Sequence, residues 1–176
     1  KKGEIHEMIL QPEQWTTQTV GREFYERNTK ATAPEWVSFH FGWNIETIFF
    51  RDRRVRRAMS YTFDHDEMLE ELCYSLYDPC AGIFYPGAWM ASTKKLDPYK
   101  QDLDKAEALL DEAGWIDRDN DGVRDKEIDG RIVPFEFSIL VNQQPLRIAI
   151  CTLLKENLDQ IGIRLNVRPV ESTVLQ

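Results

Sequence analysis

Residues 135–170 read FEFSILVNQQPLRIAICTLLKENLDQIGIRLNVRPV, and this stretch determines the fold class that the sequence predicts. Apolar and polar side chains alternate over residues 135–141 and again over residues 163–167, which is the pattern of strands that bury one face. Between them, Pro145 opens a helix with apolar side chains at helical spacing, and Gly162 closes it. A strand, a helix and a second strand in this order predict a right-handed crossover between two parallel strands, and therefore an α/β fold.

The N-terminal part of the sequence predicts first a helix and then a strand. Residues 12–27 begin with Pro12 at the first position of a helix, although Gly21 weakens its middle. Residues 37–45 alternate aromatic or aliphatic residues with polar or small ones, which predicts a strand with one face on the core. The apolar residues of this strand are Val37, Phe39, Phe41, Trp43 and Ile45.

Three further helices are predicted next along the chain. Asp52 caps the first, and Asp64 begins a capping box for the second. The third runs over residues 102–113 and ends at Gly114. Between the second and the third, residues 77–99 form a long irregular segment rich in Pro, Gly and aromatic residues, and long loops of this kind often carry function.

Composition limits the class of protein. The 176 residues are 42% hydrophobic and carry a net charge of −8, which allows a packed core and disfavours binding to the phosphates of nucleic acids. No repeat or linker divides the chain, which predicts a single α/β domain over residues 1–176. No apolar run reaches membrane-spanning length, and residues 1–4 lack the hydrophobic region of a secretory signal. Because the chain starts and stops without terminal signatures, we expect it to be a piece of a longer protein.

No pattern in the sequence indicates catalysis. The three histidines lie in different local contexts without ligand spacing, and neither a nucleophile elbow nor a Gly-rich phosphate loop is present. Cys73, Cys80 and Cys151 match no zinc motif. A bridge between Cys73 and Cys80 stays open, but a buried free thiol fits the apolar helix face on which Cys73 is predicted to lie. The sequence therefore predicts no enzyme and no required cofactor.

Residues 117–125 read DRDNDGVRD, the most specific local pattern in the chain. Alternating aspartates before a glycine can wrap a hard cation such as calcium, but Ile128 stands where an EF-hand loop needs its bidentate glutamate. Two interpretations stay open: a structural calcium site, or an acidic hydrated turn whose aspartates bond their own backbone. The candidate ligands are Asp117, Asp119, Asp121, the carbonyl of Val123 and, through a water, Asp125.

Aromatic and polar residues stand together at two places that suit a binding cleft. Trp43 and Asn44 lie near the end of the strand predicted over residues 37–45, and Tyr85 and Trp89 lie in the long irregular segment. Clefts are often lined by apolar surface with a few polar groups. For either tryptophan alone, a role as a packing anchor is the simpler interpretation.

Several segments, in the same order along nearly the whole chain, resemble the family 5 extracellular solute-binding proteins, which include oligopeptide-, dipeptide- and nickel-binding proteins. Residues 51–64, RDRRVRRAMSYTFD, are similar to the signature helix of that family. His65 departs from the family pattern, in which Arg or Lys is usual. The other similar segments are 42–44, 64–76, 85–89, 108–115, 117–125, 135–142 and 161–163, and residues 3–5 resemble the middle of the family's second lobe.

This resemblance implies a periplasmic-binding-protein-like lobe, with a mixed sheet and flanking helices, in a clamshell of two α/β lobes. The chain would cover part of the second lobe. The implied function is capture of an oligopeptide or another small solute by closure of the lobes, and delivery to the permease of an ABC transporter, without catalysis. The implied location is periplasmic or at the cell surface, with membrane contact only through a lipid anchor outside this chain.

The resemblance also narrows the candidate site. The acidic residue that pairs with a peptide's amino terminus in oligopeptide members lies beyond Gln176. Two alternatives to a transport function stay open: a sensory or chaperone-like binding module of the same fold, and a calcium-stabilised surface domain. Six residues at strand ends or in the long irregular segment are candidates for facing the cleft, namely Trp43, Asn44, Tyr85, Trp89, Asn142 and Gln143.

Overall fold

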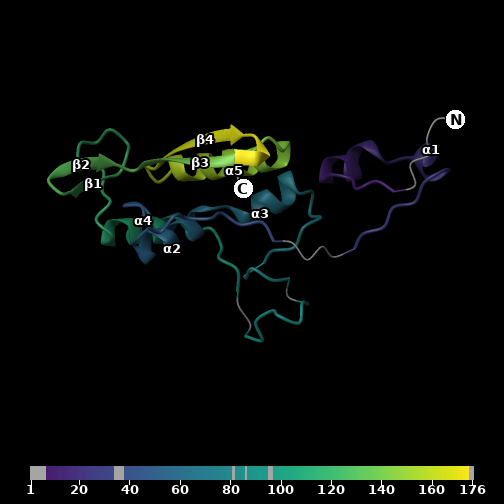
Figure 1. Cartoon of the computed structure of the whole chain (residues 1–176), viewed down its shortest axis with the longest axis horizontal. Coiled ribbons are helices and arrows are strands. Elements are labelled where there is room, and N and C mark those ends of the chain that lie inside the picture. The colour runs from purple at the N-terminus through teal and green to yellow at the C-terminus, as the bar shows by residue number, and fades with distance from the viewer. Residues whose placement is uncertain (1–6, 34–37, 81, 86, 95–96, 175–176) are drawn as a thin grey trace.

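The computed structural model describes residues 7–33, 38–80, 82–85, 87–94 and 97–174. Figure 1 shows β3, β4 and α5 together on one side of the molecule, with α2 and α4 on the other and the β1–β2 hairpin at one end. None of the helices formed by these residues is long and apolar enough to cross a membrane. The elements are η1 Gln14–Gln18, α1 Arg22–Tyr25, α2 Arg53–Thr62, α3 His65–Glu67, η2 Met68–Leu72, α4 Leu103–Glu112, β1 Asp125–Ile128, β2 Arg131–Pro134, β3 Glu136–Asn142, α5 Pro145–Asp159, β4 Arg164–Val170 and η3 Ser172–Val174.

The predicted strand–helix–strand unit is present. β3 and β4 are parallel and paired from Glu136 opposite Arg164 to Asn142 opposite Val170, and α5 connects them. Pro145 stands at the start of α5, where its missing N–H loses no helical hydrogen bond. Gly162 has a φ of +75° at the helix end, and a Cβ there would lie 3.2 Å from the carbonyl oxygen of Gly122. The prediction of two parallel strands joined by a helix is therefore confirmed.

The core is built around a cluster of aromatic rings. Phe135 is fully buried and Trp115 is 1% exposed, and their ring centroids are 4.4 Å apart. Phe49 stacks on both rings, at 5.2 Å from Phe135 and 5.6 Å from Trp115. Aliphatic side chains from α2, α4, α5 and β4 close the core around them, which joins the two layers seen in Figure 1. These side chains are Val55, Ala58, Met59, Ala106, Leu110, Leu154, Leu158 and Leu165.

Three helices begin at a capping aspartate, and the sequence predicted two of these caps, Asp52 and Asp64. Asp52 accepts a hydrogen bond from the backbone N–H of Arg54 at 2.8 Å, and Asp102 accepts one from Lys105 at 3.0 Å. Asp64 accepts one from the N–H of Glu67 at 2.9 Å. These bonds satisfy N–H groups that have no partner within the helix, which explains why each helix starts where it does.

The capping box predicted at Asp64 is only half formed. The N–H of Asp64 donates to Oδ1 of Asn157 in α5 at 2.9 Å, in place of the predicted return bond from Glu67. Asn157 is 3% exposed, so its amide lies in the core and joins the start of α3 to the crossover helix. A long-range partner therefore replaces the local one.

Replacement of Asn157 by alanine is expected to lower the free energy of unfolding by about 1–3 kcal/mol, because it leaves the N–H of Asp64 without its acceptor. Urea denaturation followed by circular dichroism measures the change. The matched control is Asn166→Ala, which removes an asparagine that is exposed on β4 and bonds Glu136. Equal losses in the two variants would show that the buried hydrogen bond contributes nothing specific.

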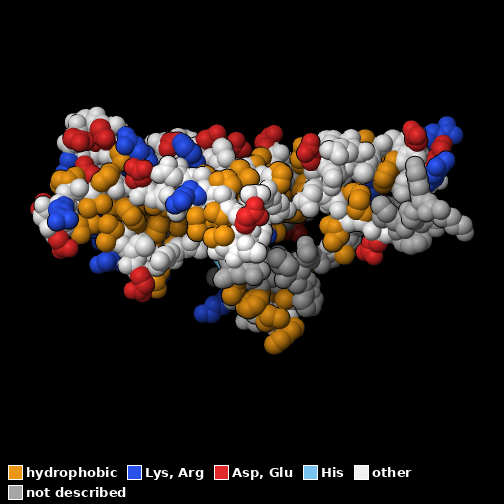
Figure 2. Space-filling model, turned by 45° about the horizontal axis from the view of Figure 1, so that its top comes forward, with side chains coloured by type: hydrophobic (Ala, Val, Ile, Leu, Met, Phe, Trp, Pro, Cys, Tyr) orange, Lys and Arg blue, Asp and Glu red, His pale blue; other side chains and the backbone are white. Residues whose placement is uncertain are grey.

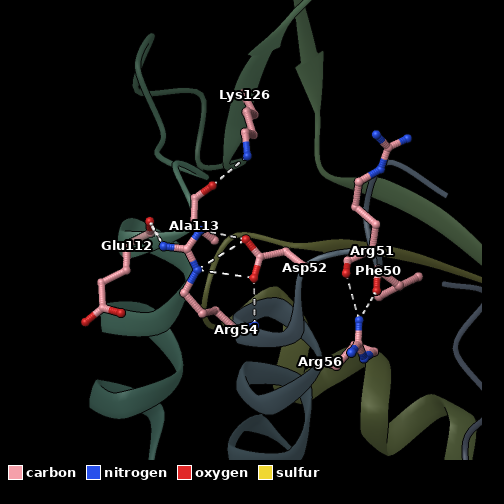
Figure 3. A network of polar contacts seen from close by, with 8 residues as sticks. All are labelled: Phe50, Arg51, Asp52, Arg54, Arg56, Glu112, Ala113 and Lys126. Atoms are coloured by element: carbon pink, nitrogen blue, oxygen red, sulfur yellow. Dashed lines mark hydrogen bonds and ion pairs between the residues drawn. The ribbon is translucent and has the colours of Figure 1, made fainter. Parts of the chain in front are cut away.

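Residues 51–57 contain five arginines, and two of them bind backbone carbonyls. Arg54 donates to the carbonyl oxygen of Glu112 at 2.6 Å, and Lys126 donates to that of Ala113 at 2.7 Å, so two cations hold the carboxyl end of α4 (Figure 3). Arg56 donates to the carbonyl oxygens of Phe50 and Arg51. Cations are favourable at helix carboxyl ends, where unpaired carbonyls concentrate negative charge. The arginines of residues 51–57 therefore form a solvated helix face, and one of them, Arg54, also joins α2 to α4.

The strand predicted over residues 37–45 is wrong for the described residues 38–45, and Val37 lies outside them. The side chains still follow the alternation in part, since the rings of Phe41 and Trp43 pack 6.0 Å apart against the core. Phe39, in contrast, is 55% exposed. A strand needs a neighbouring backbone, and no β-ladder of the described chain includes these residues.

Two local features also differ from the sequence prediction. The helix predicted over residues 12–27 is divided into η1 and α1, because Thr19 and Gly21 both leave helical geometry, with Gly21 at a φ of +97°. The antiparallel β1–β2 hairpin was not predicted. Its signal is the pair Asp129–Gly130, both with positive φ, which forms the two-residue turn typical of hairpins.

The cysteines form no disulfide in the structure. Cys73 and Cys151 are buried free thiols and Cys80 is an exposed one, which confirms the prediction for Cys73. Burial raises the pKa of the Cys73 and Cys151 thiols, so both stay protonated and behave as small apolar side chains.

Candidate functional site

The carboxyl ends of β3 and β4 form a polar edge. Because the two strands are parallel, Asn142 and Val170 end at the same side of the sheet, and α5 begins there. Across this edge, Nε2 of Gln143 donates to Oε1 of Glu171 at 3.1 Å. In open α/β sheets, ligands bind outside the carboxyl ends of the strands. This edge is therefore the best-supported candidate site.

The polar groups of this edge keep donors available. Oδ1 of Asn142 accepts from the N–H of Gln144 at 3.4 Å, while its amide nitrogen bonds no residue in the described part of the chain. Gln143 is exposed and Asn142 is partly buried, so both can meet a solute without rearrangement of the core. Glu171 was not predicted from the sequence. Its signal is its position directly after β4, the strand paired with the one that ends in Asn142.

Trp43 and Asn44 lie elsewhere. The Trp43 ring is partly buried, 4.7 Å from the Phe50 ring and 6.0 Å from that of Phe137, close to the start of β3. Phe137 precedes Asn142 by five positions, which is roughly 16 Å along a strand. Oδ1 of Asn44 accepts from the N–H of Glu46 at 3.0 Å and shapes a turn. The structure therefore does not bring these two residues to the carboxyl edge.

Tyr85 and Trp89 belong to the irregular segment that extends away from the two layers (Figure 1). Trp89 is 86% exposed, and Tyr85 is partly buried and accepts a turn hydrogen bond from Ala88. Figure 2 shows hydrophobic side chains gathered on this protruding part, where Ile83 and Phe84 are also exposed. Their assignment to the cleft stays a prediction.

The acidic segment 117–125 forms a turn between α4 and β1. One oxygen from each of Asp117, Asp119 and Asp125 lies within 4.8 Å of the others. The backbone N–H of Gly122 donates to Oδ2 of Asp117 at 3.0 Å, and that of Asp121 donates to Oδ1 of Asp119 at 3.3 Å. Oδ1 of Asp117 is buried and has no partner among the described residues. The turn therefore combines the self-bonding of an acidic loop with a carboxylate oxygen that suits a cation.

The remaining candidate ligands are less available. Oδ1 of Asp121 accepts from the N–H of Val123 at 2.8 Å. Both oxygens of Asp125, which is 5% exposed, accept from the backbone and the guanidinium of Arg118. Burial opposes the charged form, but the hydrogen bonds and charge of Arg118 prevail and hold the pKa of Asp125 below its usual value. A cation in this turn would therefore bind first to Asp117 and Asp119.

If calcium binds this turn, a concentration about a hundred times its Kd is expected to raise the melting temperature by about 5–10 °C, because the ion binds the folded chain alone. Differential scanning calorimetry with calcium and then with a chelator measures the shift. Asp117→Asn should abolish it by removing the charge of the carboxylate whose Oδ1 is buried. Asp129→Asn, which changes an exposed turn residue of the hairpin, should keep it. No shift in the unmodified chain would favour the acidic turn without metal.

A hollow of about 440 Å³ lies beside α3. Burial lowers the pKa of His65, although a hydrogen bond to the Phe63 carbonyl and the nearby Asp64 and Asp66 oppose the shift, so the imidazole is neutral near pH 7. None of the six candidate cleft residues lines this hollow. Its lining residues are Asp64, His65, Asp66, Glu67, Glu70, Glu71, Lys100 and Gln101.

The chain is similar to known binding proteins in sequence and in structure. Oligopeptide-binding protein AppA of Bacillus subtilis (strain 168) is 31% identical over 143 residues, which are 77% of this chain and 25% of that protein. The structure of AppA from Bacillus subtilis in complex with a nonapeptide matches with a TM-score of 0.69 and 29% identity, over 76% of this chain and 26% of that one. NikZ from Campylobacter jejuni in complex with Ni(L-His) matches with a TM-score of 0.62 and 30% identity, over 74% and 26%.

These matches confirm the predicted fold, an α/β lobe of the periplasmic-binding-protein type. The chain spans about a quarter of the length of the relatives that it matches. The sequence profile of the bacterial extracellular solute-binding proteins, family 5, middle region, matches residues 1–176. The chain therefore belongs to the family 5 extracellular solute-binding proteins.

Proposed function

We propose that this chain is part of the second lobe of a solute-binding protein that captures peptides, or a similar small solute, for an ABC importer. The observation that carries the proposal is the polar carboxyl edge, where Asn142, Gln143 and Glu171 meet at the start of α5. Amide and carboxylate groups of this kind can bond the N–H and C=O groups of a peptide backbone. Relatives support the choice, since AppA was solved with a nonapeptide.

The proposed mechanism is capture by closure of two lobes. Each lobe supplies part of the contacts, and closure removes the solute from water, which strengthens polar contacts. The closed form would then present the solute to a membrane permease outside the cytoplasm, in the periplasm or at the cell surface. No chemical step is needed, so a bound peptide should be recovered intact.

Native mass spectrometry of the full-length protein, purified without refolding, tests this proposal. A ladder of masses that fits intact short peptides is expected. Asn142→Ala should reduce the bound fraction, whereas Asn166→Ala, on the exposed face of β4, should leave it unchanged. A protein that carries no solute and also fails to bind a peptide panel would contradict the proposal, and so would hydrolysis of the bound peptide.

A further inference from the structure

Four large apolar side chains are exposed together on the irregular segment between η2 and α4, and we call them the apolar tip. Trp89 is the largest of them and is 86% exposed. Figure 2 shows hydrophobic side chains gathered on this part of the surface, where it protrudes from the two layers. Single apolar residues are normal on a protein surface, but a gathered group marks a contact with another surface. The members of the apolar tip are Ile83, Phe84, Trp89 and Met90.

Two consecutive turns hold the apolar tip in this exposed arrangement. The backbone N–H of Ala88 donates to the carbonyl oxygen of Tyr85 at 2.8 Å, and that of Ala91 donates to the carbonyl oxygen of Ala88 at 3.0 Å. A Cβ added at Gly87 would lie 2.6 Å from the Tyr85 ring, so this ring packs against the first turn while Trp89 faces solvent. Because the backbone is already ordered, a contact with Trp89 costs little additional conformational entropy.

The base of the same segment is joined to the start of α5. Oγ of Ser38 donates to the carbonyl oxygen of Ile83 at 2.9 Å, and the rings of Phe39 and Tyr77 stack with centroids 6.2 Å apart. The guanidinium carbon of Arg147, in the first turn of α5, lies 5.1 Å from the centroid of the Phe39 ring. Since α5 begins at the carboxyl edge, the segment that carries the apolar tip leaves the two layers beside the candidate site.

The length and charge of the chain indicate which surface covers the apolar tip. The chain spans about a quarter of the length of the relatives that it matches, so about three quarters of a protein of that length lie outside residues 1–176. The charges of the two aspartates and two lysines in residues 77–99 cancel, so this segment lacks the surplus of basic residues that attracts a peripheral segment to an anionic membrane. The polypeptide outside residues 1–176 is therefore the partner that these observations favour.

We propose that the apolar tip is an interlobe contact, on which the other lobe, formed by polypeptide outside residues 1–176, packs when the two lobes close. This inference rests on the proposed function, because closure around a solute brings the other lobe to the apolar tip. Closure removes Trp89 and its neighbours from water, and this burial stabilises the closed form alone. The apolar tip thus shifts the equilibrium towards the closed form in addition to the contacts with the solute.

Hydroxyl-radical footprinting of the full-length protein, read by mass spectrometry, tests the inference. Oxidation rates are compared without peptide and with two saturating tetrapeptide libraries, one glycine-rich and one leucine-rich. The rates of Ile83 and Trp89 are expected to fall about fivefold with either library, because the core of a closed contact excludes water. The matched control is Ile132 on the hairpin, which is 59% exposed against 65% for Ile83, and its rate should not change.

Substitution of Trp89 gives a second measurement. Trp89→Ala should weaken the binding of both libraries about tenfold in calorimetric titration, the loss expected for an aromatic side chain at the centre of an interface. Trp89→Phe should lose less, because an aromatic ring is kept. Ile132→Ala should bind both libraries as the unmodified protein does.

The outcomes separate this inference from the proposed function. Binding of both libraries without a change in the oxidation of the apolar tip would overturn the interlobe contact and leave peptide capture standing. Protection by the leucine-rich library alone would show that the solute itself covers Trp89, and protection that grows with protein concentration would show that a second copy does. Either result overturns the inference. If neither library binds, the proposed function and the inference fall together.

Discussion

Replacing Phe135 by alanine is expected to lower the free energy of unfolding by about 3–5 kcal/mol, the range for large aromatic side chains in well-packed cores. Phe135 is fully buried, and its ring packs against rings from two distant parts of the chain, those of Phe49 and Phe50 and that of Trp115. Because the loss approaches the whole stability of many domains, the variant should be largely unfolded near its working temperature. Chemical denaturation followed by tryptophan fluorescence measures it.

The matched control is Leu140→Ala, which truncates a side chain on the exposed face of β3, the strand that begins directly after Phe135. Leu140 is 47% exposed, so this change should alter stability by no more than about 0.5 kcal/mol. A comparable loss in both variants would contradict the placement of Phe135 in the core. The comparison also tests which side chains of this extended segment face the core, because successive side chains alternate between its two faces and Phe135 and Leu140 lie on opposite ones.

Residues 1–176 alone are expected to bind the solute about a thousand times more weakly than the full-length protein. Under capture by closure, each lobe supplies part of the contact free energy. If each lobe supplies half of the binding free energy, a micromolar Kd, which corresponds to about −8.2 kcal/mol, becomes a millimolar Kd, which corresponds to about −4.1 kcal/mol. Titration calorimetry of both proteins with the same peptide measures the ratio.

This experiment needs evidence that the separate chain is folded. Cooperative thermal unfolding of residues 1–176 supplies it, and Phe135→Ala provides an unfolded reference. A folded chain that binds as tightly as the full-length protein would contradict capture by two lobes. It would show that the carboxyl edge is sufficient for binding.

The sequence allowed prediction of features that depend on neighbouring residues. The strand–helix–strand unit could be predicted because alternation, Pro145 and Gly162 all act within a few residues of the elements they define. The caps at Asp52 and Asp64 could be predicted for the same reason. Asn142 and Gln143 could be named as candidates because they lie at the end of a predicted strand, whereas Glu171, across the same edge, was not predicted.

Features that depend on distant residues could not be predicted. Alternation over residues 38–45 gave the side-chain pattern of a strand but no information on a pairing partner. Asn157 reaches Asp64 across the fold, and Arg147 meets Phe39 in a similar way. Such contacts depend on tertiary packing, which local patterns do not encode.

The two cations at the carboxyl end of α4 have a consequence for local opening of the structure. Arg54 belongs to α2 and Lys126 to the hairpin, so each bond joins α4 to a different element (Figure 3). Opening of the last turn of α4 must break both. We therefore expect α2, α4 and the hairpin to exchange their amide hydrogens as one cooperative unit rather than as three independent segments.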